Sequence, residues 1–254
     1  VSEYMTYLNE YAEELTTAIL FNQEVIQISK DQYFCTELES GGKIYSKNVI
    51  CCNGKSSNSK KIDRFKYSSA KKIVQAKDWR LSDIKPNDKV LVVGNGLSAC
   101  EIAQMSRDVS DDITLSLKYS LKTIPLTLFG FNLHWFFRPL EKLPRYFFPI
   151  CKKKYKDPVL DVGIKKLIQD EKIKVINSAS EVNIKYDLVI QSIGYEYGVG
   201  ILPKGLQLWS NGNIATDKNE TSLKGLYLLG HPCSGNFDSV YLRWICRDAK
   251  KLAK

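Results

Sequence analysis

Two closely spaced glycines follow an apolar run near the middle of the chain. Residues 90–93 are continuous β-branched and apolar side chains, as expected of a parallel strand buried on both faces. Gly94 permits a tight turn, Gly96 lets the backbone approach a phosphate, and Ala99 stands where a third glycine allows close helix packing. Ser98 and the first helical amides would face an anion. The candidate cofactor-binding residues of this segment are Gly94, Asn95, Gly96, Leu97, Ser98, Ala99 and Glu101.

A GxGxxA pattern alone also fits an ordinary strand-to-helix turn, so the next strand matters. That strand is expected over residues 113–117, and an NAD site places an acidic residue at its end, on the ribose. Residues 118–122 contain no carboxylate. Lys118, Ser120 and Lys122 could instead hold a 2′-phosphate, which favours NADPH over NADH; the alternative is that the two lysines are simply solvated.

Length and composition suit an α/β enzyme or a large part of one. The chain has 254 residues and 44% hydrophobic content, enough for one large or two modest cores. It contains no run of about 18 apolar residues and no signal-peptide pattern. We therefore expect an intracellular, cytoplasmic protein without a transmembrane segment.

Conventional catalytic side chains are scarce. The seven cysteines show neither CxxC nor metal-ligand spacing, so we expect buried thiols in a reducing compartment and no metal site. The adjacent Cys51 and Cys52 could be redox-active, but vicinal cysteines in an apolar strand also simply pack. The two histidines, His134 and His231, leave little room for a histidine-based triad. The chemistry is therefore expected to rely on a cofactor.

The net charge of +9 could attract nucleic acid or an anionic membrane. The densest basic cluster, residues 152–156, lacks an interleaved aromatic platform, so a solvated face is the preferred interpretation and no nucleic-acid partner is predicted. Residues 126–150 are rich in aromatic side chains but are interrupted by charges, which argues against a membrane span. We expect amphipathic helical packing there, with peripheral membrane contact as an alternative.

The chain divides into three parts, predicted as residues 1–64, 65–182 and 183–254. The first contains a helical pattern, short strands and a buried strand that arrives at Gly54; the second contains the glycine turn; the third closes with an apolar strand before a final helix. The elements expected in the first part are a helix over Glu3–Leu20, strands over Glu24–Ser29, Tyr33–Leu38 and Lys43–Ile50, and a hairpin turn at Gly41-Gly42.

Four motifs in this order resemble the flavin-containing monooxygenases, most closely the YUCCA-type and related bacterial class B flavoprotein monooxygenases. The glycine turn resembles their NADPH-binding motif, and residues 187–195 are similar to "D-x-V-I-x-A-T-G-Y". Cys52-Asn53-Gly54 replaces an earlier "A-T-G", and residues 225–230 resemble the C-terminal strand that contacts the flavin.

The resemblance implies an α/β fold in which a Rossmann-like NAD(P)-binding domain, residues 65–182, is inserted into a partial FAD-binding domain of a two-dinucleotide flavoprotein. It implies FAD and NADPH as cofactors, and oxygenation of a small organic substrate by molecular oxygen through a flavin peroxide. The alternative explanation for Tyr195 is packing, and that for Asp238 is capping of a surface helix that starts near residues 236–238. The implied flavin-side residues are Cys52, Gly54, Ile193, Gly194, Tyr195, Gly230 and Asp238.

The sequence also departs from the family. No opening strand with a first GxGxxG precedes Lys89, so we expect a truncated or split monooxygenase. In the fingerprint near the interdomain link, Ser69, Lys71 and Gln75 replace Phe, Gly and His, whereas Trp79 is retained. Two other hypotheses therefore stay open: a non-catalytic NADPH-binding remnant, and a flavin-linked disulfide reductase, which should carry a paired CxxC or CxxxxC. Substrate identity and a possible homo-oligomer are left open.

Overall fold

A computed structural model represents the 254-residue chain. The structure describes residues 2–54, 58–60, 69–125, 127–128, 130–132, 159–161, 163–177, 185–196, 198–210, 212–232, 234 and 242–253. These residues form two compact units, one built from residues 1–49 and 199–205 and the other from residues 50–198 and 206–254.

The first unit carries one helix and an antiparallel three-stranded sheet in the order β1-β2-β3. Phe34 is fully buried and Ile28 nearly so, and Gly41 turns the β2-β3 hairpin with a φ of 84°. The predicted strands β1 and β2 and the hairpin are confirmed. The elements are α1 (Ser2–Glu13), β1 (Val25–Lys30), β2 (Phe34–Leu38) and β3 (Lys43–Ser46).

Two predicted boundaries in this region are wrong. The helix expected to reach Leu20 ends at Glu13, because Thr16 and Thr17 are poor helix formers and the exposed helix gains little from packing. The single strand expected over Lys43–Ile50 is two strands, since β3 pairs with β2 whereas β4 (Val49–Cys51) joins a different sheet.

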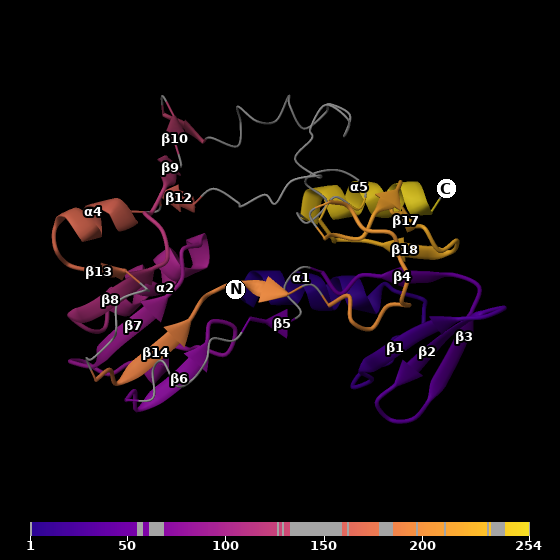
Figure 1. The fold of residues 1–254 in the computed structure, drawn as a ribbon, viewed down its shortest axis with the longest axis horizontal. Coiled ribbons are helices and arrows are strands. Elements are labelled where there is room, and N and C mark those ends of the chain that lie inside the picture. The colour runs from indigo at the N-terminus through magenta and orange to yellow at the C-terminus, as the bar shows by residue number, and fades with distance from the viewer. Residues whose placement is uncertain are drawn as a thin grey trace. The chain divides into compact units, whose positions relative to one another are not determined.

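The second unit is centred on a five-stranded sheet in the order β13-β8-β7-β14-β6, all of it parallel (Figure 1). The chain moves from β7 to β8 on one side, while β14 lies on the other side of β7. Ligands of open α/β sheets bind where the strand order reverses in this way, at the carboxyl ends of the strands. The strands are β6 (Lys72–Gln75), β7 (Lys89–Val93), β8 (Asp112–Leu117), β13 (Lys174–Asn177) and β14 (Leu188–Gln191).

Helix α2 (Leu97–Arg107) packs on β7 and β8 (Figure 1). Its buried side chains, among them Ala99 and Ala103, join a large apolar cluster with the residues of β7 and β8 that face the helix. A smaller cluster around Leu91 and Val189 covers the opposite face. The strand, turn and helix predicted from the sequence are confirmed, and burial on both faces explains why β7 is a continuous apolar run.

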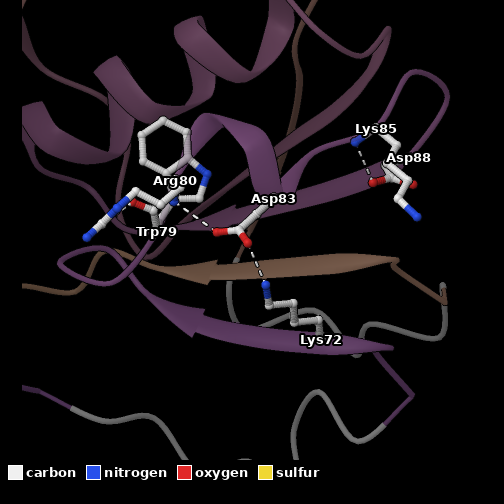
Figure 2. A network of polar contacts seen from close by, with 6 residues as sticks. All are labelled: Lys72, Trp79, Arg80, Asp83, Lys85 and Asp88. Atoms are coloured by element: carbon white, nitrogen blue, oxygen red, sulfur yellow. Dashed lines mark hydrogen bonds and ion pairs between the residues drawn. The ribbon is translucent and has the colours of Figure 1, made fainter.

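The connection from β6 to β7 contains the short 3₁₀ helix η2 (Leu81–Asp83), held by one carboxylate. Figure 2 shows Asp83 between Lys72 of β6, whose Nζ lies 2.6 Å from Oδ1, and the backbone amide of Arg80, which donates to Oδ2 at 2.9 Å. The pKa of Asp83 is lowered, mainly by the Lys72 hydrogen bond. Trp79, retained from the family fingerprint, packs against the apolar cluster beside α2.

The described part of residues 126–150 is not helical. Its residues pair as the two short antiparallel strands β10 and β11, so the helical prediction is wrong there, because Gly130 makes a left-handed turn with a φ of 80°. Residues 133–150 and the basic cluster 152–156 lie outside the described residues. The elements nearby are β9 (Thr123–Pro125), β10 (Thr127–Leu128), β11 (Phe131–Asn132), β12 (Val159–Asp161) and α4 (Ile164–Gln169).

A four-stranded sheet in the order β16-β17-β18-β4 joins β4, about one fifth of the way along the chain, to strands of its last fifty residues. The apolar strand predicted within residues 225–230 is confirmed as β18. The final helix is described from Leu242, and its predicted start at residues 236–238 lies outside the described residues. The elements are β5 (Asn58–Ser59), β15 (Tyr195–Glu196), β16 (Thr216–Asp217), β17 (Glu220–Thr221), β18 (Leu226–Leu228) and α5 (Leu242–Leu252).

Of the described cysteines, Cys51 and Cys100 are buried as expected, but Cys52 and Cys246 are exposed. The prediction of uniformly buried thiols is therefore wrong, because Cys52 follows the end of its strand and Cys246 lies on an exposed face of α5. Within the ranges that the structure describes, no helix combines the length and apolar character needed to cross a bilayer.

Candidate dinucleotide site

The turn after β7 requires glycine at its first position. A Cβ on Gly94 would collide with the backbone carbonyl oxygen of Ser192, and it would lie 3.1 Å from Cβ of Ala99. The Gly94 amide donates to the Ser116 carbonyl at 3.1 Å, which ties the turn to the end of β8. Gly94 and Ala99 therefore serve close packing between strand, helix and the segment that follows β14, as their positions in the pattern predict.

The second glycine faces open space. Gly96 is exposed, and a Cβ placed on it would meet no heavy atom within 4 Å. It is the N-cap of α2 in an extended conformation, and the first turn of α2 contains no acidic residue. The amides of Leu97 and Ser98 lack helical partners by geometry and lie at the positive end of an 11-residue helix. This end of α2 can receive a phosphate without displacing a side chain.

Asn95, the variable residue between the glycines, holds the segment after β8 against the turn. Its Oδ1 accepts hydrogen bonds from the Lys118 amide at 2.6 Å and the Tyr119 amide at 3.3 Å. Its Nδ2 donates to the Tyr119 carbonyl at 2.7 Å. The Asn95 carboxamide thus both accepts from and donates to the backbone of residues 118–119, as a neighbouring strand would. These bonds hold Lys118 beside the glycine turn.

The segment after β8 presents basic and polar groups. Lys118, Ser120 and Lys122 are all exposed, and the Lys118 ammonium lies 5.5 Å from the centre of the Tyr119 ring. An exposed aromatic ring next to a lysine offers both a stacking surface and a positive charge. Glu101, the remaining predicted residue of this motif, is exposed one turn along α2.

The end of β14 completes the edge of the site. Ser192 donates its amide to the Val93 carbonyl at 2.8 Å, and Ile193 packs into the apolar cluster opposite α2. Gly194 follows with a φ of 87°, and its carbonyl accepts a hydrogen bond from the Lys60 amide at 3.0 Å. Tyr195 then enters β15, where it pairs with Ser59.

Two residues that differ from the family fingerprint, Lys71 and Gln75, contact side chains at the two ends of the β14 segment. Lys71 forms an ion pair with Asp187 at 2.5 Å, just before the strand begins, and this contact is the main cause of the lowered pKa of Asp187. Gln75 donates from Nε2 to Oε1 of Gln191 at 2.5 Å, at the end of the strand. Lys71 and Gln75 therefore contact Asp187 and Gln191, at the two ends of the β14 segment.

A second cluster joins the end of β4 to the segment after β18. The Asn53 side chain lies at its centre: Nδ2 donates to the Gly198 carbonyl at 2.6 Å, and Oδ1 lies 2.8 Å from His231 Nε2. The Cys51 thiol donates to the same Oδ1 at 3.2 Å. Cys52 and Gly54 flank Asn53, and Gly230 precedes His231, so three predicted flavin-side residues are brought to one place.

This network fixes the protonation of His231. Because Asn53 Nδ2 donates to a carbonyl, its Oδ1 must accept, and His231 therefore carries its hydrogen on Nε2. Burial lowers the pKa of His231, which is 3% exposed, so the ring is neutral near pH 7. Burial also raises the pKa of Cys51, which keeps it a thiol.

Polar contacts also order the chain beyond His231. Ser234 donates its hydroxyl to the His231 carbonyl at 3.0 Å and accepts from Asn219 Nδ2 at 3.2 Å. Thr216 donates to the Ser234 carbonyl at 2.7 Å. These buried contacts hold His231 and Ser234 in place, whereas Asp238, a predicted flavin-side residue, lies outside the described residues.

Sequence reasoning missed the roles of Asn53, His231 and Gln191. With only two histidines the sequence predicts no histidine-based triad, and the signal for His231 is its position directly after Gly230, where the segment that resembles the flavin-contacting strand ends. Asn53 is the middle residue of Cys52-Asn53-Gly54, in which only Cys52 and Gly54 are predicted flavin-side residues. The partner of Gln191 is 116 residues away, and no local pattern reveals such a pair.

The geometry fits a dinucleotide at the glycine turn. Gly94 and Ala99 let β7, α2 and the segment after β14 pack closely, and Gly96 leaves the approach to the start of α2 open. Near β4 and β18, Gly54 and Gly230 adopt left-handed φ values of 65° and 75°, and a Cβ on Gly230 would lie 3.2 Å from the Ile245 side chain. Gly230 thus allows the segment after β18 to pack closely against α5.

Known proteins resemble the chain over nearly its full length. The sequence profile of the pyridine nucleotide-disulphide oxidoreductases matches residues 4–242. An uncharacterized CzcO-like oxidoreductase of Geobacillus kaustophilus (strain HTA426) is 28% identical and aligns with 98% of this chain and 76% of its own length.

Solved structures extend the likeness to the fold. A flavin-containing monooxygenase from Stenotrophomonas maltophilia has a TM-score of 0.72 at 14% identity, covering 99% of this chain and 74% of that one. Thioredoxin reductase from T. acidophilum has a TM-score of 0.62 at 16% identity, covering 99% and 79%. The predicted α/β fold with two dinucleotide-binding regions is confirmed, as is the resemblance to flavin monooxygenases.

Proposed function

The chain belongs to the pyridine nucleotide-disulphide oxidoreductase family, and we propose that within it the protein is an NADPH- and FAD-dependent monooxygenase of small organic substrates. Membership makes it a flavin-type oxidoreductase. The choice of NADPH rests on one observation above all: Asn95 places Lys118, rather than a carboxylate, beside the glycine turn.

In this proposal each part of the turn has one task. The amides of Leu97 and Ser98 bind the pyrophosphate, and Gly96 leaves room for it. Lys118 and Ser120 bind the 2′-phosphate, with Lys122 nearby in the same segment. Salt will weaken this contact, because the lysines are exposed.

The flavin-side cluster positions backbone rather than catalytic side chains. Asn53 and His231 hold the ends of β4 and β18 together, so that Cys52, Gly54 and Gly230 present backbone to the flavin. When bound, NADPH supplies a hydride to FAD, and the reduced flavin supplies the electrons that activate molecular oxygen. The chain's own contribution is to hold both cofactors and exclude water.

The cysteines favour oxygenation over disulfide reduction. Flavin-linked disulfide reductases need a reactive thiolate with a partner, whereas the sequence has no CxxC or CxxxxC. The adjacent pair is unsuited as well, because burial raises the pKa of Cys51 and its thiol is engaged by Asn53. We therefore place the protein with the monooxygenase neighbours.

We further propose that residues 65–182 form the NADPH domain, inserted between FAD-domain segments 1–64 and 183–254. We propose a cytoplasmic enzyme without a nucleic-acid partner. Its homo-oligomeric state can be measured by light scattering.

The test is a visible spectrum of the chain after incubation with FAD and desalting, followed by anaerobic NADPH. We expect retained flavin that bleaches with NADPH and, in air, NADPH-dependent oxygen consumption. Binding of NADPH without retained flavin would favour a nucleotide-binding remnant. Reduction of a disulfide substrate instead of oxygen would favour a reductase.

A further inference from the structure

A row of three buried side chains and one half-buried side chain crosses the parallel sheet at its carboxyl edge. Ser116, Val93, Gln191 and Gln75 are direct partners in neighbouring strands β8, β7, β14 and β6. Direct partners project to the same face of a sheet. Val93 belongs to the small apolar cluster, so this row lies on the face opposite α2. We call these four residues the carboxyl row.

Three members of the carboxyl row carry a buried polar atom without a partner among the described residues. These atoms are Oγ of Ser116, Nε2 of Gln191 and Oε1 of Gln75. Gln191 is 3% exposed and Ser116 1% exposed. An unpaired buried polar group is unfavourable, so three of them within one row of four residues call for a ligand or water.

After the two glutamines bond to each other, one hydrogen-bond donor and one acceptor of the pair have no partner among the described residues. Gln75 Nε2 donates to Gln191 Oε1, which consumes one donor and one acceptor. One amino group and one carbonyl remain. Exchanging the nitrogen and oxygen of both amides reverses the bond but again leaves one donor and one acceptor. The pair therefore matches a ligand that offers both, as a primary carboxamide does.

The carboxyl row continues the dinucleotide path. Gly94 directly follows Val93 in the chain, and its amide binds the Ser116 carbonyl. A dinucleotide that starts at the end of β8 and crosses the turn after β7 brings its second half to the ends of β14 and β6. Gln191 and Gln75 stand at those ends.

We propose that Gln191 and Gln75 bind the carboxamide of the nicotinamide ring, an inference that rests on the proposed NADPH site. The Gln191 amino group donates to the carboxamide oxygen, and the Gln75 carbonyl accepts from its nitrogen. Both atoms are shielded in this structure, so the half-buried Gln75 side chain must shift to admit the carboxamide while it keeps its hydrogen bond to Gln191. This orients the nicotinamide by two hydrogen bonds.

Binding to the 254-residue chain, measured by calorimetry, tests the inference without any enzyme assay. The ligands are NADP⁺, its 3-acetylpyridine analogue, which keeps the carbonyl but lacks the amino group, and 2′-phospho-ADP-ribose, which lacks the ring. The variants are Gln191→Leu and Gln75→Leu. Gln169→Leu, exposed on α4, is the matched control.

We expect the wild type to bind NADP⁺ about tenfold tighter than 2′-phospho-ADP-ribose, with the 3-acetylpyridine analogue in between. Gln191→Leu and Gln75→Leu should lose most of this difference and keep wild-type affinity for 2′-phospho-ADP-ribose. Gln169→Leu should change nothing. Where a variant fails to fold, the comparison of NADP⁺ with the 3-acetylpyridine analogue on the wild type decides.

Equal wild-type affinity for NADP⁺ and the 3-acetylpyridine analogue, or unchanged NADP⁺ binding in both glutamine variants, would overturn the inference. The carboxyl row would then be bridged by buried water. If 2′-phospho-ADP-ribose does not bind the wild type, the proposed NADPH site fails as well. The two failures are thus distinguished by the ligand that lacks the ring.

Discussion

The Asn95 carboxamide oxygen accepts a hydrogen bond from the Lys118 amide at 2.6 Å, across 23 residues of sequence. This contact links the two halves of the candidate site, because Asn95 belongs to the phosphate turn and Lys118 to the segment that would bind the 2′-phosphate. In the proposed function, specificity for NADPH would therefore depend on a residue that the glycine pattern leaves variable.

Replacing Asn95 should weaken nucleotide binding, because the segment after β8 that carries Lys118 would no longer be held beside the glycine turn. Asn95→Ala removes three hydrogen bonds to the segment after β8, so we expect lower NADPH affinity and a smaller preference over NADH. The free energy of unfolding should fall by only about 1 kcal/mol, because the contacts lie near the surface. Fluorescence titration with both nucleotides checks this. An unchanged NADPH to NADH ratio would contradict it.

Lys118 should act on the 2′-phosphate alone. For Lys118→Ala we expect roughly tenfold weaker NADPH binding, unchanged NADH binding, and a shallower salt dependence for NADPH. Lys172→Ala, another exposed lysine of the same unit, serves as the control. Titrations at two salt concentrations make the measurement. Equal wild-type affinity for NADH and NADPH would refute the cofactor assignment itself.

The two glycines of the turn should respond differently to the same methyl group. Gly94→Ala drives a Cβ into the Ser192 carbonyl, and we expect unfolding free energy to fall by about 1–3 kcal/mol. Gly96→Ala meets open space, so its cost should stay under about 1 kcal/mol, while NADPH binding is lost to the methyl group at the phosphate. Denaturant unfolding and nucleotide titration separate the effects; similar unfolding costs would argue against this packing.

The stability of the protein should fall in mild acid because of His231. Burial lowers its folded-state pKa below the ordinary value of 6.5, so the unfolded chain takes up the proton first as pH falls. The contribution of the neutral, buried His231 to the free energy of unfolding is complete above the ordinary pKa of 6.5. It is lost as pH falls through the folded-state pKa.

The matched variant is His231→Gln, which stays neutral and can still donate to Asn53. We expect the unfolding free energy of the wild type to decline more steeply than that of the variant below about pH 6.5. Denaturant unfolding at a series of pH values provides the measurement. Parallel pH profiles would show that His231 does not titrate in this way.

The sequence by itself determined the local elements of the nucleotide site. The apolar run of β7, the GxGxxA turn and the missing acid after β8 are all short-range signals, because strand burial, backbone freedom and helix polarity depend on neighbouring residues. It failed where tertiary context decides, as at the end of α1, where no packing extends the helix beyond Glu13.

Only the tertiary structure decided which distant side chains meet. Gln75 and Gln191 become partners because β6 lies next to β14, and Asn53 meets His231 because β4 lies next to β18. Strand order is set by which faces bury the most apolar surface across the whole sheet, and no local spacing encodes it. The glycine turn could therefore be found in the sequence, whereas the contacts that would give it specificity required the fold.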